Sequence, residues 1–403
     1  MPIMTAPALA SKTDVCLADW TASMQRSVLR QMLAVVSRPG ILSFAGGLPA
    51  QELFPVADYA EALNGVLQSD PTALQYGPPF RPLKAHIVEL MAERGVDCRE
   101  EQVFLTTGAQ QALDVLSRLF LDPGGTVMLE EIIYTGIQQA VAPMQPCVLP
   151  VRTDLETGID VDQVEDYLLA GHRPAFLYLI PDAHNPLGVS LSAEKRERLA
   201  ALAVAHNMPI VEDDPYGLLT YDGRNLPPLR ALNESHVFYV GSFSKILAPA
   251  LRLGWMVVPE ELIPKLTVIK EAGDLESSAL TQRAVAAYLD AGHLPAHLER
   301  LRAEYRIRRD AMLAALREHL PPTFYWTRPR GGMFIWVRLP KGLDAGVLLS
   351  KAVEQEKVAF IPGYAFAHCG ADAGNYLRLN FSNCCISDIH DGIARLAAVL
   401  RAA

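Results

Sequence analysis

Short apolar segments alternate with amphipathic ones between about residues 58 and 260, and this alternation restricts the possible folds more than any other feature. Stretches such as SAEKRERLAALAVAH (192–206) have the apolar spacing of helices and separate several of the apolar segments. Repeated strand–helix–strand units predict a mostly parallel sheet with helices on both faces, so the expected fold class is α/β. The clearest expected strands are residues 126–130, 175–180, 209–213, 237–241 and 253–258.

The pattern changes after about residue 260. Long charged helices follow, around residues 298–320, and FYWTRPRGGMFIWVRLP (324–340) is typical of a hairpin before a last helix. A chain of 403 residues also exceeds what one hydrophobic core usually serves. We therefore predict a large domain over 58–295 and a smaller α+β domain over 296–403. Residues 1–57 are expected to form a tail, a helix (22–37) and a GGLP loop.

Composition excludes several classes of protein. The net charge is −9 and no basic block occurs, which argues against nucleic acid as a partner. Six scattered cysteines without a CxxC pair argue against a disulfide framework or a structural zinc site, and they fit a reducing cytoplasm. We find no secretory signal and no apolar run that could cross a bilayer, so a soluble cytoplasmic protein is expected.

Polar groups follow several of the expected strands. The stretch TTGAQQALD starts a helix at residues 106–114, where free N–H groups could hold a phosphate, although an ordinary helix cap is the alternative. Asn185 follows the strand at 175–180, and asparagine is also common in turns. Asp213 closes an apolar strand, where a carboxylate needs a cation or a strong donor.

A metal site is not expected. Asp213 and Asp214 are adjacent and point in different directions, and no histidine pair lies close to them in sequence. His293 and His297 have helical spacing, but Pro295 lies between them, so we expect both to be surface residues at a helix start.

Lys245 lies in GSFSKILAPALRLGW (241–255), directly after an expected strand, and the alternative is a solvated surface lysine. A phosphate cradle, an asparagine donor, a buried carboxylate and a lysine amine at neighbouring strand ends are what pyridoxal phosphate requires. No GxGxxG or GxxxxGK[ST] motif favours a nucleotide instead.

From about residue 20 onward the sequence resembles the class I/II aminotransferases of pyridoxal-phosphate fold type I. The subgroup that contains 2-aminoadipate and kynurenine aminotransferases is the most similar. The most specific stretches are ILSFAGGLPAQELFP, LQYGPPFRPLKAHI, TTGAQQALD, YLIPDAHNPLG, VEDDPY, GSFSKILAPALRLGW, RPRGGMFIW and NYLRLNFS. The resemblance implies a homodimer whose active sites are shared across the interface.

The resemblance also implies roles for single residues in cofactor binding. Lys245 would bond to the cofactor aldehyde, Asp213 would keep the ring nitrogen protonated, and Tyr134 would stack on the ring as a third catalytic residue. Asn185 and Tyr216 would contact the ring hydroxyl, and Tyr76 would reach the phosphate of the neighbouring subunit's cofactor. The other implied phosphate contacts are Gly108, Ala109, Gln110, Ser242, Ser244 and Arg252.

For the substrate, the resemblance implies that Arg378 clamps the α-carboxylate, with Gly47 and Asn185 beside it. The resemblance further implies that residues 1–57 are part of the small domain and help to cover the substrate, with a mobile helix at 22–37. From this helix Ser27 and Arg30 would face the substrate side chain, and Arg30 could accept an acidic group. Leu187 and Ile133 depart from the family's usual residues near the active site, which bears on substrate preference.

The expected reaction moves the amino group of a broad range of L-α-amino acids, acidic, aromatic or aliphatic, to a 2-oxo acid such as 2-oxoglutarate. The expected scheme is ping-pong, with Lys245 as the proton carrier. One alternative is another pyridoxal-phosphate reaction such as β-elimination; Arg378 disfavours decarboxylation because it would hold the carboxylate in place. The other is a non-catalytic amino-acid sensor, but the roughly 40 residues before GGLP leave no room for the DNA-binding domain of such regulators.

Overall fold

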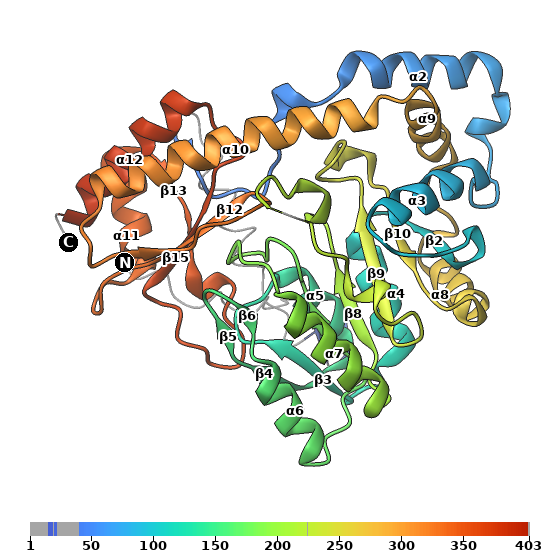
Figure 1. Ribbon diagram of the computed structural model, residues 1–403, viewed down its shortest axis with the longest axis horizontal. Helices are drawn as coiled ribbons and strands as arrows, with labels where there is room; N and C mark the ends of the chain where they lie inside the picture. The colour runs from blue at the N-terminus through green and yellow to red at the C-terminus, as the bar shows by residue number, and fades with distance from the viewer. Residues whose placement is uncertain (1–14, 19, 22–39, 224, 402–403) are drawn as a thin grey trace.

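The computed structural model describes residues 15–18, 20–21, 40–223 and 225–401. Its largest element is a seven-stranded sheet in which every strand except β10 runs in the same direction (Figure 1). The α/β fold class predicted from the alternation is confirmed. In spatial order the strands are β2 (Val103–Thr106), β10 (Gly254–Val257), β9 (Val237–Ser242), β8 (Ile210–Asp213), β7 (Leu177–Leu179), β3 (Thr126–Glu130) and β4 (Cys147–Val151).

Strand β10 is antiparallel to both of its neighbours because of the short connection that precedes it. Residues 243–253 separate β9 from β10 and contain no α-helix. A parallel pairing needs a crossover of a dozen or more residues, usually a helix. The segment 253–258 was therefore correctly predicted as a strand, and its direction follows from the length of the connection.

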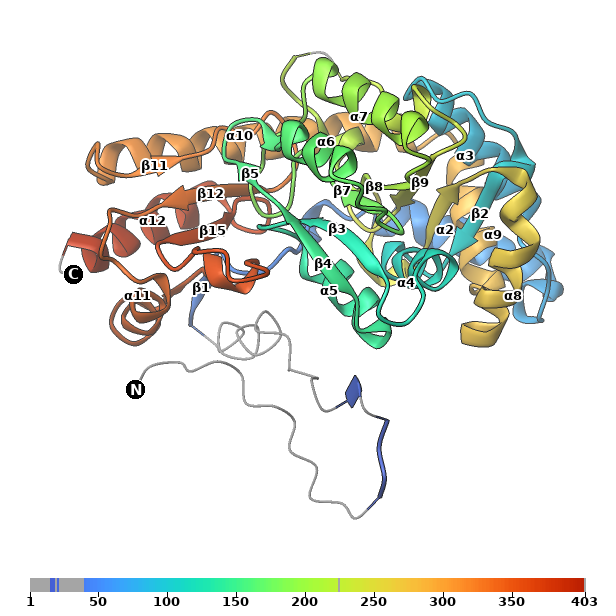
Figure 2. The same ribbon diagram turned by 90° about the horizontal axis from the view of Figure 1, so that it is seen from below.

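Helices cover both faces of this sheet, and successive side chains of a strand enter two different cores (Figure 2). Met128 packs with α6 and α7, whereas its neighbours Val127 and Leu129 belong to the core that contains α4 and α5. This period of two explains why the strands are apolar throughout. The helices around the sheet are α2 (Val56–Ser69), α3 (Arg81–Glu93), α4 (Ala109–Phe120), α5 (Thr135–Val141), α6 (Val161–Leu169), α7 (Ala193–Ala205), α8 (Ile263–Asp274) and α9 (Ala279–Asp290).

A smaller four-stranded sheet lies at the other end of the molecule (Figure 1). The expected hairpin is confirmed, since β11 (Tyr325–Trp326) pairs antiparallel with β12 (Phe334–Arg338). The sheet continues through β15 (Tyr376–Asn380) to β14 (Ile361–Pro362). The long helix α10 (Leu294–His319) connects the two parts and packs against α12 (Ile386–Arg401). The remaining elements here are α11 (Ala345–Lys351) and the parallel pair β1 (Leu42–Ser43) and β13 (Val358–Ala359).

The prediction for His293 and His297 is partly wrong. Both stand at a helix start, because His293 caps α10, but His297 is only 6% exposed. Helix α10 turns the face of its first turn that carries Leu294, His297 and Leu298 into the core. Burial lowers the pKa of His297 to about 4, so it is neutral at pH 7.

Some expectations are not tested by the fold. The helix predicted at 22–37 lies outside the described residues, and the domain boundaries at 58 and 296 stay predictions. All six cysteines fall in the described part of the chain and are free thiols. Among the described residues, no helix is both long and apolar enough to span a membrane.

Candidate active site

The parallel strands β7, β8 and β9 end at the same edge of the large sheet, and the predicted site residues follow them there. Asn185 lies in the loop after β7, Asp213 is the last residue of β8, and Lys245 follows β9. The carboxyl edge of such a sheet is where ligands usually bind in this class of fold. Arg378, from β15 of the small sheet, reaches the same place because it bonds to Asn185.

The amine of Lys245 lies in a partly buried position beside the GGLP loop. Its Nζ donates to the carbonyl oxygen of Gly47 at 2.7 Å. Burial, together with the positive charges of Arg378 and Arg252, lowers the pKa of Lys245 to about 8. An amine with this pKa is partly unprotonated near neutral pH and is a competent nucleophile.

The carboxylate of Asp213 is buried, and one of its two oxygens accepts a hydrogen bond. The Tyr178 hydroxyl donates to Oδ2 at 2.8 Å, whereas Oδ1 has no hydrogen-bond partner among the residues that the structure describes. Burial, and to a lesser degree the charge of Asp214, raises the pKa of Asp213 to about 7, against the lowering effect of Tyr178. A cationic N–H donor at Oδ1 would satisfy the free oxygen and favour the ionised carboxylate.

Arg378 is a buried cation that forms no ion pair within the described part of the chain. Its side chain is 1% exposed, and its Nη1 and Nη2 donate to Asn185 Oδ1 at 2.8 Å and to the carbonyl oxygen of Ala45 at 2.7 Å. The guanidinium carbon lies 4.2 Å from the ring centre of Phe334 and 4.8 Å from that of Phe366. Burial lowers its pKa to about 10, and an anionic ligand would compensate this desolvation.

The start of helix α4 meets Arg252. Gly108 caps this helix at φ 80°, and a Cβ there would lie 2.7 Å from Nη2 of Arg252, which donates to the carbonyl oxygen of Thr107 at 3.3 Å. Ala109 and Gln110 form the first turn, whose N–H groups have no intrahelical partner. A helix start beside a guanidinium favours an anion such as phosphate.

Two serines and two tyrosines remain among the predicted residues. Ser242 is the last residue of β9, Ser244 directly precedes Lys245, and the Ser242 hydroxyl accepts the backbone N–H of Ser244 at 3.1 Å. Tyr134 donates to Gln110 Oε1 at 3.4 Å, and Tyr216 packs its ring edge-on against Phe334 at 5.9 Å. Tyr134 thus lies beside the first turn of α4, and Tyr216 lies against the ring on which Arg378 stacks.

Among the predicted residues that the structure describes, Tyr76 is not brought to this site: it is 85% exposed, and its backbone N–H donates to Oε1 of Gln75. Ser27 and Arg30 lie outside the described residues, so their roles stay predictions. Leu187 and Ile133, the two departures from the family pattern, are fully buried and pack in the core.

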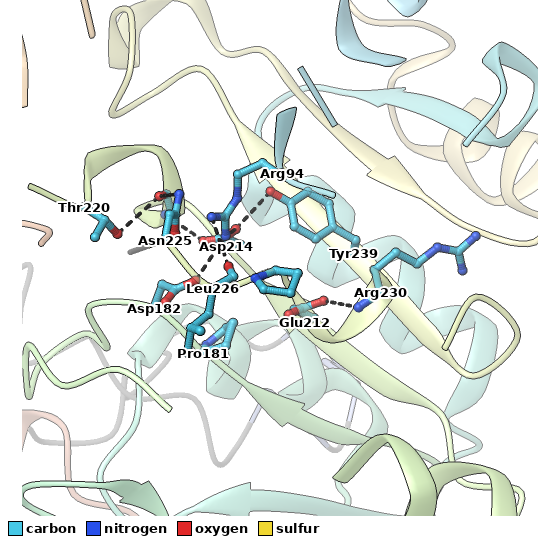
Figure 3. A network of polar contacts seen from close by, with 12 residues as sticks. Arg94, Pro181, Asp182, Glu212, Asp214, Thr220, Asn225, Leu226, Arg230 and Tyr239 are labelled. Atoms are coloured by element: carbon cyan, nitrogen blue, oxygen red, sulfur yellow. Dashed lines mark hydrogen bonds and ion pairs between the residues drawn. The ribbon is translucent and has the colours of Figure 1, made fainter. Parts of the chain in front are cut away.

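Two features of the site were not predicted from the sequence. Tyr178, inside the apolar strand AFLYLI, carries a hydroxyl that could have signalled a polar partner. A buried ionic network lies behind Asp213, where Arg94 bonds to Asp182 and Asp214 (Figure 3). No local sequence pattern predicts this network, because 120 residues separate Arg94 from Asp214.

Comparisons with known proteins agree with this geometry. The sequence model described as "Aminotransferase class I and II" matches residues 40–396. The chain belongs to this family. It is 41% identical to a 2-aminoadipate transaminase of Thermus thermophilus, over 94% of each chain. It is 39% identical to aromatic-amino-acid aminotransferase 1 of Thermococcus litoralis, over 94% of this chain and 92% of that protein.

A solved structure is equally similar. The α-aminoadipate aminotransferase LysN of Thermus thermophilus, complexed with N-(5'-phosphopyridoxyl)-L-leucine, superposes with a TM-score of 0.88. Its sequence is 39% identical, with 96% of this chain and 97% of that chain covered. The predicted fold type I, the 2-aminoadipate and kynurenine subgroup and the enzyme class are confirmed: the protein is an aminotransferase.

The predicted cofactor, pyridoxal phosphate, is confirmed as well. The geometry of this chain fits it on three counts. An orphaned buried carboxylate oxygen on Asp213 suits a protonated ring nitrogen. The glycine-capped helix beside Arg252 suits a phosphate, and the amine of Lys245 suits an aldehyde.

Proposed function

We propose that this aminotransferase moves the amino group of an L-α-amino acid to 2-oxoglutarate by a ping-pong scheme. Its range would be broad, with aminoadipate and aromatic amino acids as the leading donors. The names of the most similar relatives support these donors. The observation that carries the proposal is that Lys245, Asp213 and Arg378 meet at one sheet edge with a reactive amine, a free carboxylate oxygen and an unpaired guanidinium.

We assign each of these three residues a part in the reaction. Arg378 binds the α-carboxylate of the amino acid through a planar, bidentate fork and so orients the Cα–H bond. Lys245 takes the proton from Cα and later returns a proton to the reacting centre. Asp213 keeps a proton on the ring nitrogen through Oδ1. Pyridoxal phosphate, when bound, supplies the aldehyde that accepts the amino group and a ring that withdraws electrons.

The residues around this centre would bind and enclose the reactants. The start of α4, with Gly108, Ala109, Gln110, Ser242, Ser244 and Arg252, would hold the phosphate. Tyr134 would stack on the ring, and Asn185 and Tyr216 would contact its hydroxyl. Gly47 lies next to Lys245 at the substrate side. Tyr76 supports a homodimer, because an 85% exposed aromatic ring suits burial against a second subunit.

Arg378→Lys tests the proposal through the carboxylate. A lysine keeps the charge but loses the fork, so we expect the KM for the amino donor to rise about a hundredfold. The matched control is Arg338→Lys on the adjacent strand β12, where the arginine stacks on Tyr325 and is exposed. An unchanged KM in Arg378→Lys would contradict the assigned role.

The products decide between amino transfer and its alternatives. Amino transfer predicts that glutamate forms from 2-oxoglutarate in a one-to-one ratio to the new oxo acid. A ping-pong scheme also predicts parallel lines in double-reciprocal plots of the initial rates. Release of ammonia instead would indicate β-elimination, and binding of the amino acid without turnover would indicate a sensor. A cytoplasmic location and the domain boundaries at 58 and 296 remain part of the proposal.

A further inference from the structure

The side chain of Arg94 joins two loops at the edge of the large sheet. Arg94 follows helix α3 and is 4% exposed. Its Nη2 donates to Asp214 Oδ2 at 2.9 Å and to Asp182 Oδ2 at 3.1 Å, and its Nη1 donates to the carbonyl oxygen of Leu226 at 3.3 Å (Figure 3). One guanidinium therefore connects the segment after β7 with the segment after β8.

These two segments carry the side chains proposed to meet the cofactor's ring hydroxyl. Asp182 precedes Asn185 by three residues, and Asp214 precedes Tyr216 by two. The Oδ1 atom of Asp214 also accepts the backbone N–H of Gly217 at 2.7 Å, which fixes the turn that contains Tyr216. A Cβ at Gly217 would overlap the Arg94 guanidinium and the Asp214 carboxylate, so the turn closes directly onto the ion pair.

Two further side chains complete the network from other elements. Arg196 of α7 donates to Asp182 Oδ1 at 2.6 Å, and Tyr239 of β9 donates to Asp214 Oδ2 at 3.1 Å. The two carboxylates and two guanidiniums balance in charge, and every side chain in their three ion pairs is at most 5% exposed.

Stability is a weak explanation for such a network. Removing two charges from water is costly, and apolar side chains of similar volume often stabilise a core equally well. Apolar packing, however, does not fix the positions of two loops relative to each other as directional hydrogen bonds do. The network holds residues only two or three positions before Tyr216 and Asn185 in the chain, and a displacement of these side chains by about 1 Å would cost catalysis heavily.

We propose that Arg94 is a positioning residue that holds the loops after β7 and β8 in register, so that Asn185 and Tyr216 meet the ring hydroxyl of the cofactor together. The proposal rests on the proposed function of these two residues. Contacts to the ring hydroxyl govern the protonation of the cofactor joined to Lys245. Arg94 thus influences, without touching the cofactor, the pH at which the visible absorption of the bound cofactor changes.

The test compares Arg94→Met and Arg94→Lys with the matched control Arg230→Met. Arg230 is 2% exposed and donates to the carbonyl oxygens of Glu234 and Val237, and it bonds to neither Asp182 nor Asp214. A pH titration of the visible absorbance gives the midpoint for each cofactor-loaded protein. Steady-state kinetics give kcat and KM, and thermal unfolding gives Tm.

In Arg94→Met we expect the absorbance midpoint to shift by about one pH unit and kcat to fall about tenfold or more, with a KM change of at most about threefold. Arg94→Lys should behave similarly, because one ammonium nitrogen cannot replace both Nη2, which bonds to the two carboxylates, and Nη1, which bonds to the carbonyl oxygen of Leu226. Arg230→Met should lower Tm without moving the midpoint. A lowered Tm with an unchanged midpoint and kcat in Arg94→Met would overturn the proposal and leave a purely structural role.

Asp182→Asn gives the decision if the Arg94 variants do not fold. It removes the carboxylate charge through which Arg94 holds the loop after β7 and leaves the pair of Arg94 with Asp214 in place. A midpoint shift relative to the unmodified enzyme supports the proposal, and an unchanged midpoint overturns it. Failure of the proposed function can be distinguished from failure of the proposal for Arg94. If the unmodified enzyme has the visible band but transfers no amino group, amino transfer is contradicted. The absorbance midpoints of the variants still report on the role of Arg94 in that case.

Discussion

Lys245 combines burial with two nearby guanidinium groups, and its pKa of about 8 follows from both. Because the folded pKa lies below the usual value of 10.5, the reactive neutral amine forms as pH rises through about 8. We predict that the apoprotein takes up pyridoxal phosphate at a rate that rises with pH around a midpoint near 8. Stopped-flow absorbance measures the rate. A midpoint near 10 would contradict the burial of the amine, and Lys245→Ala should abolish the covalent band.

Gly108 offers a second test at the scale of one residue. In Gly108→Ala the methyl group would meet Arg252 and the backbone would keep a positive φ, so we predict that the Kd for the cofactor rises about tenfold. The control is Gly124→Ala, since Gly124 has φ +74° and no heavy atom within 4 Å of its Cβ position. Equal Kd values in the two variants, from absorbance titration, would contradict the phosphate cradle.

Sequence alone indicated the residues that follow strands but not the partners that hold them. Asn185, Asp213 and Lys245 were found because strand ends converge in a parallel sheet. The bond from Tyr178 to Asp213 and the ion pair of Arg94 with Asp214 depend on the tertiary fold, and neither residue type is unusual in its own segment. Partners distant in sequence leave no local pattern.

At the scale of elements, the alternation of segments predicted the sheet and the helices that cover it. The direction of β10 can be predicted only when the length of the preceding connection is considered. The edge strand β4 (Cys147–Val151) was not predicted, because its segment has a weaker apolar pattern. The burial of His297 was missed because a helix start is usually solvated, whereas α10 packs its first turn into the core. Helix starts become predictable only when their packing partners are known.

The burial of His297 predicts a pH dependence of stability. The folded pKa of about 4 lies below the unfolded value of 6.5, so the unfolded chain binds more protons between these values and stability falls as pH drops from about 6.5 to 4. We predict that His297→Leu removes this part of the loss in the free energy of unfolding, roughly 2.5 kcal/mol at pH 4.5. Urea unfolding at pH 7 and pH 4.5 measures it. His390→Leu, at an exposed position of α12, is the control and should leave the loss unchanged.

At the scale of the whole molecule, the active site exists because two sheets meet. Arg378 of the small sheet bonds to Asn185 beside the large one, and the carbonyl oxygens of Ala45 and Gly47, which precede α2, complete the contact. Any relative movement of the two sheets would change this contact. The sequence indicated each part, but the distance between them followed only from the fold.

The exposed Tyr76 predicts that a second subunit completes the site. We expect the purified protein to be a dimer by light scattering, and Tyr76→Phe to keep the dimer while raising the Kd for the cofactor about tenfold, because a phosphate contact is lost. Tyr59→Phe on α2, a half-buried position, is the control and should leave the Kd unchanged. A monomer with full cofactor affinity would contradict the shared site.

The most direct test of amino transfer at Lys245 is a visible absorbance scan of the purified enzyme. Glutamate, aminoadipate, phenylalanine and leucine are added separately, and 2-oxoglutarate follows. We predict a yellow band that at least aminoadipate or phenylalanine bleaches and that 2-oxoglutarate restores, with the rates ranking the donors. A protein that stays colourless with added pyridoxal phosphate, or a band that no amino acid bleaches, would contradict the account.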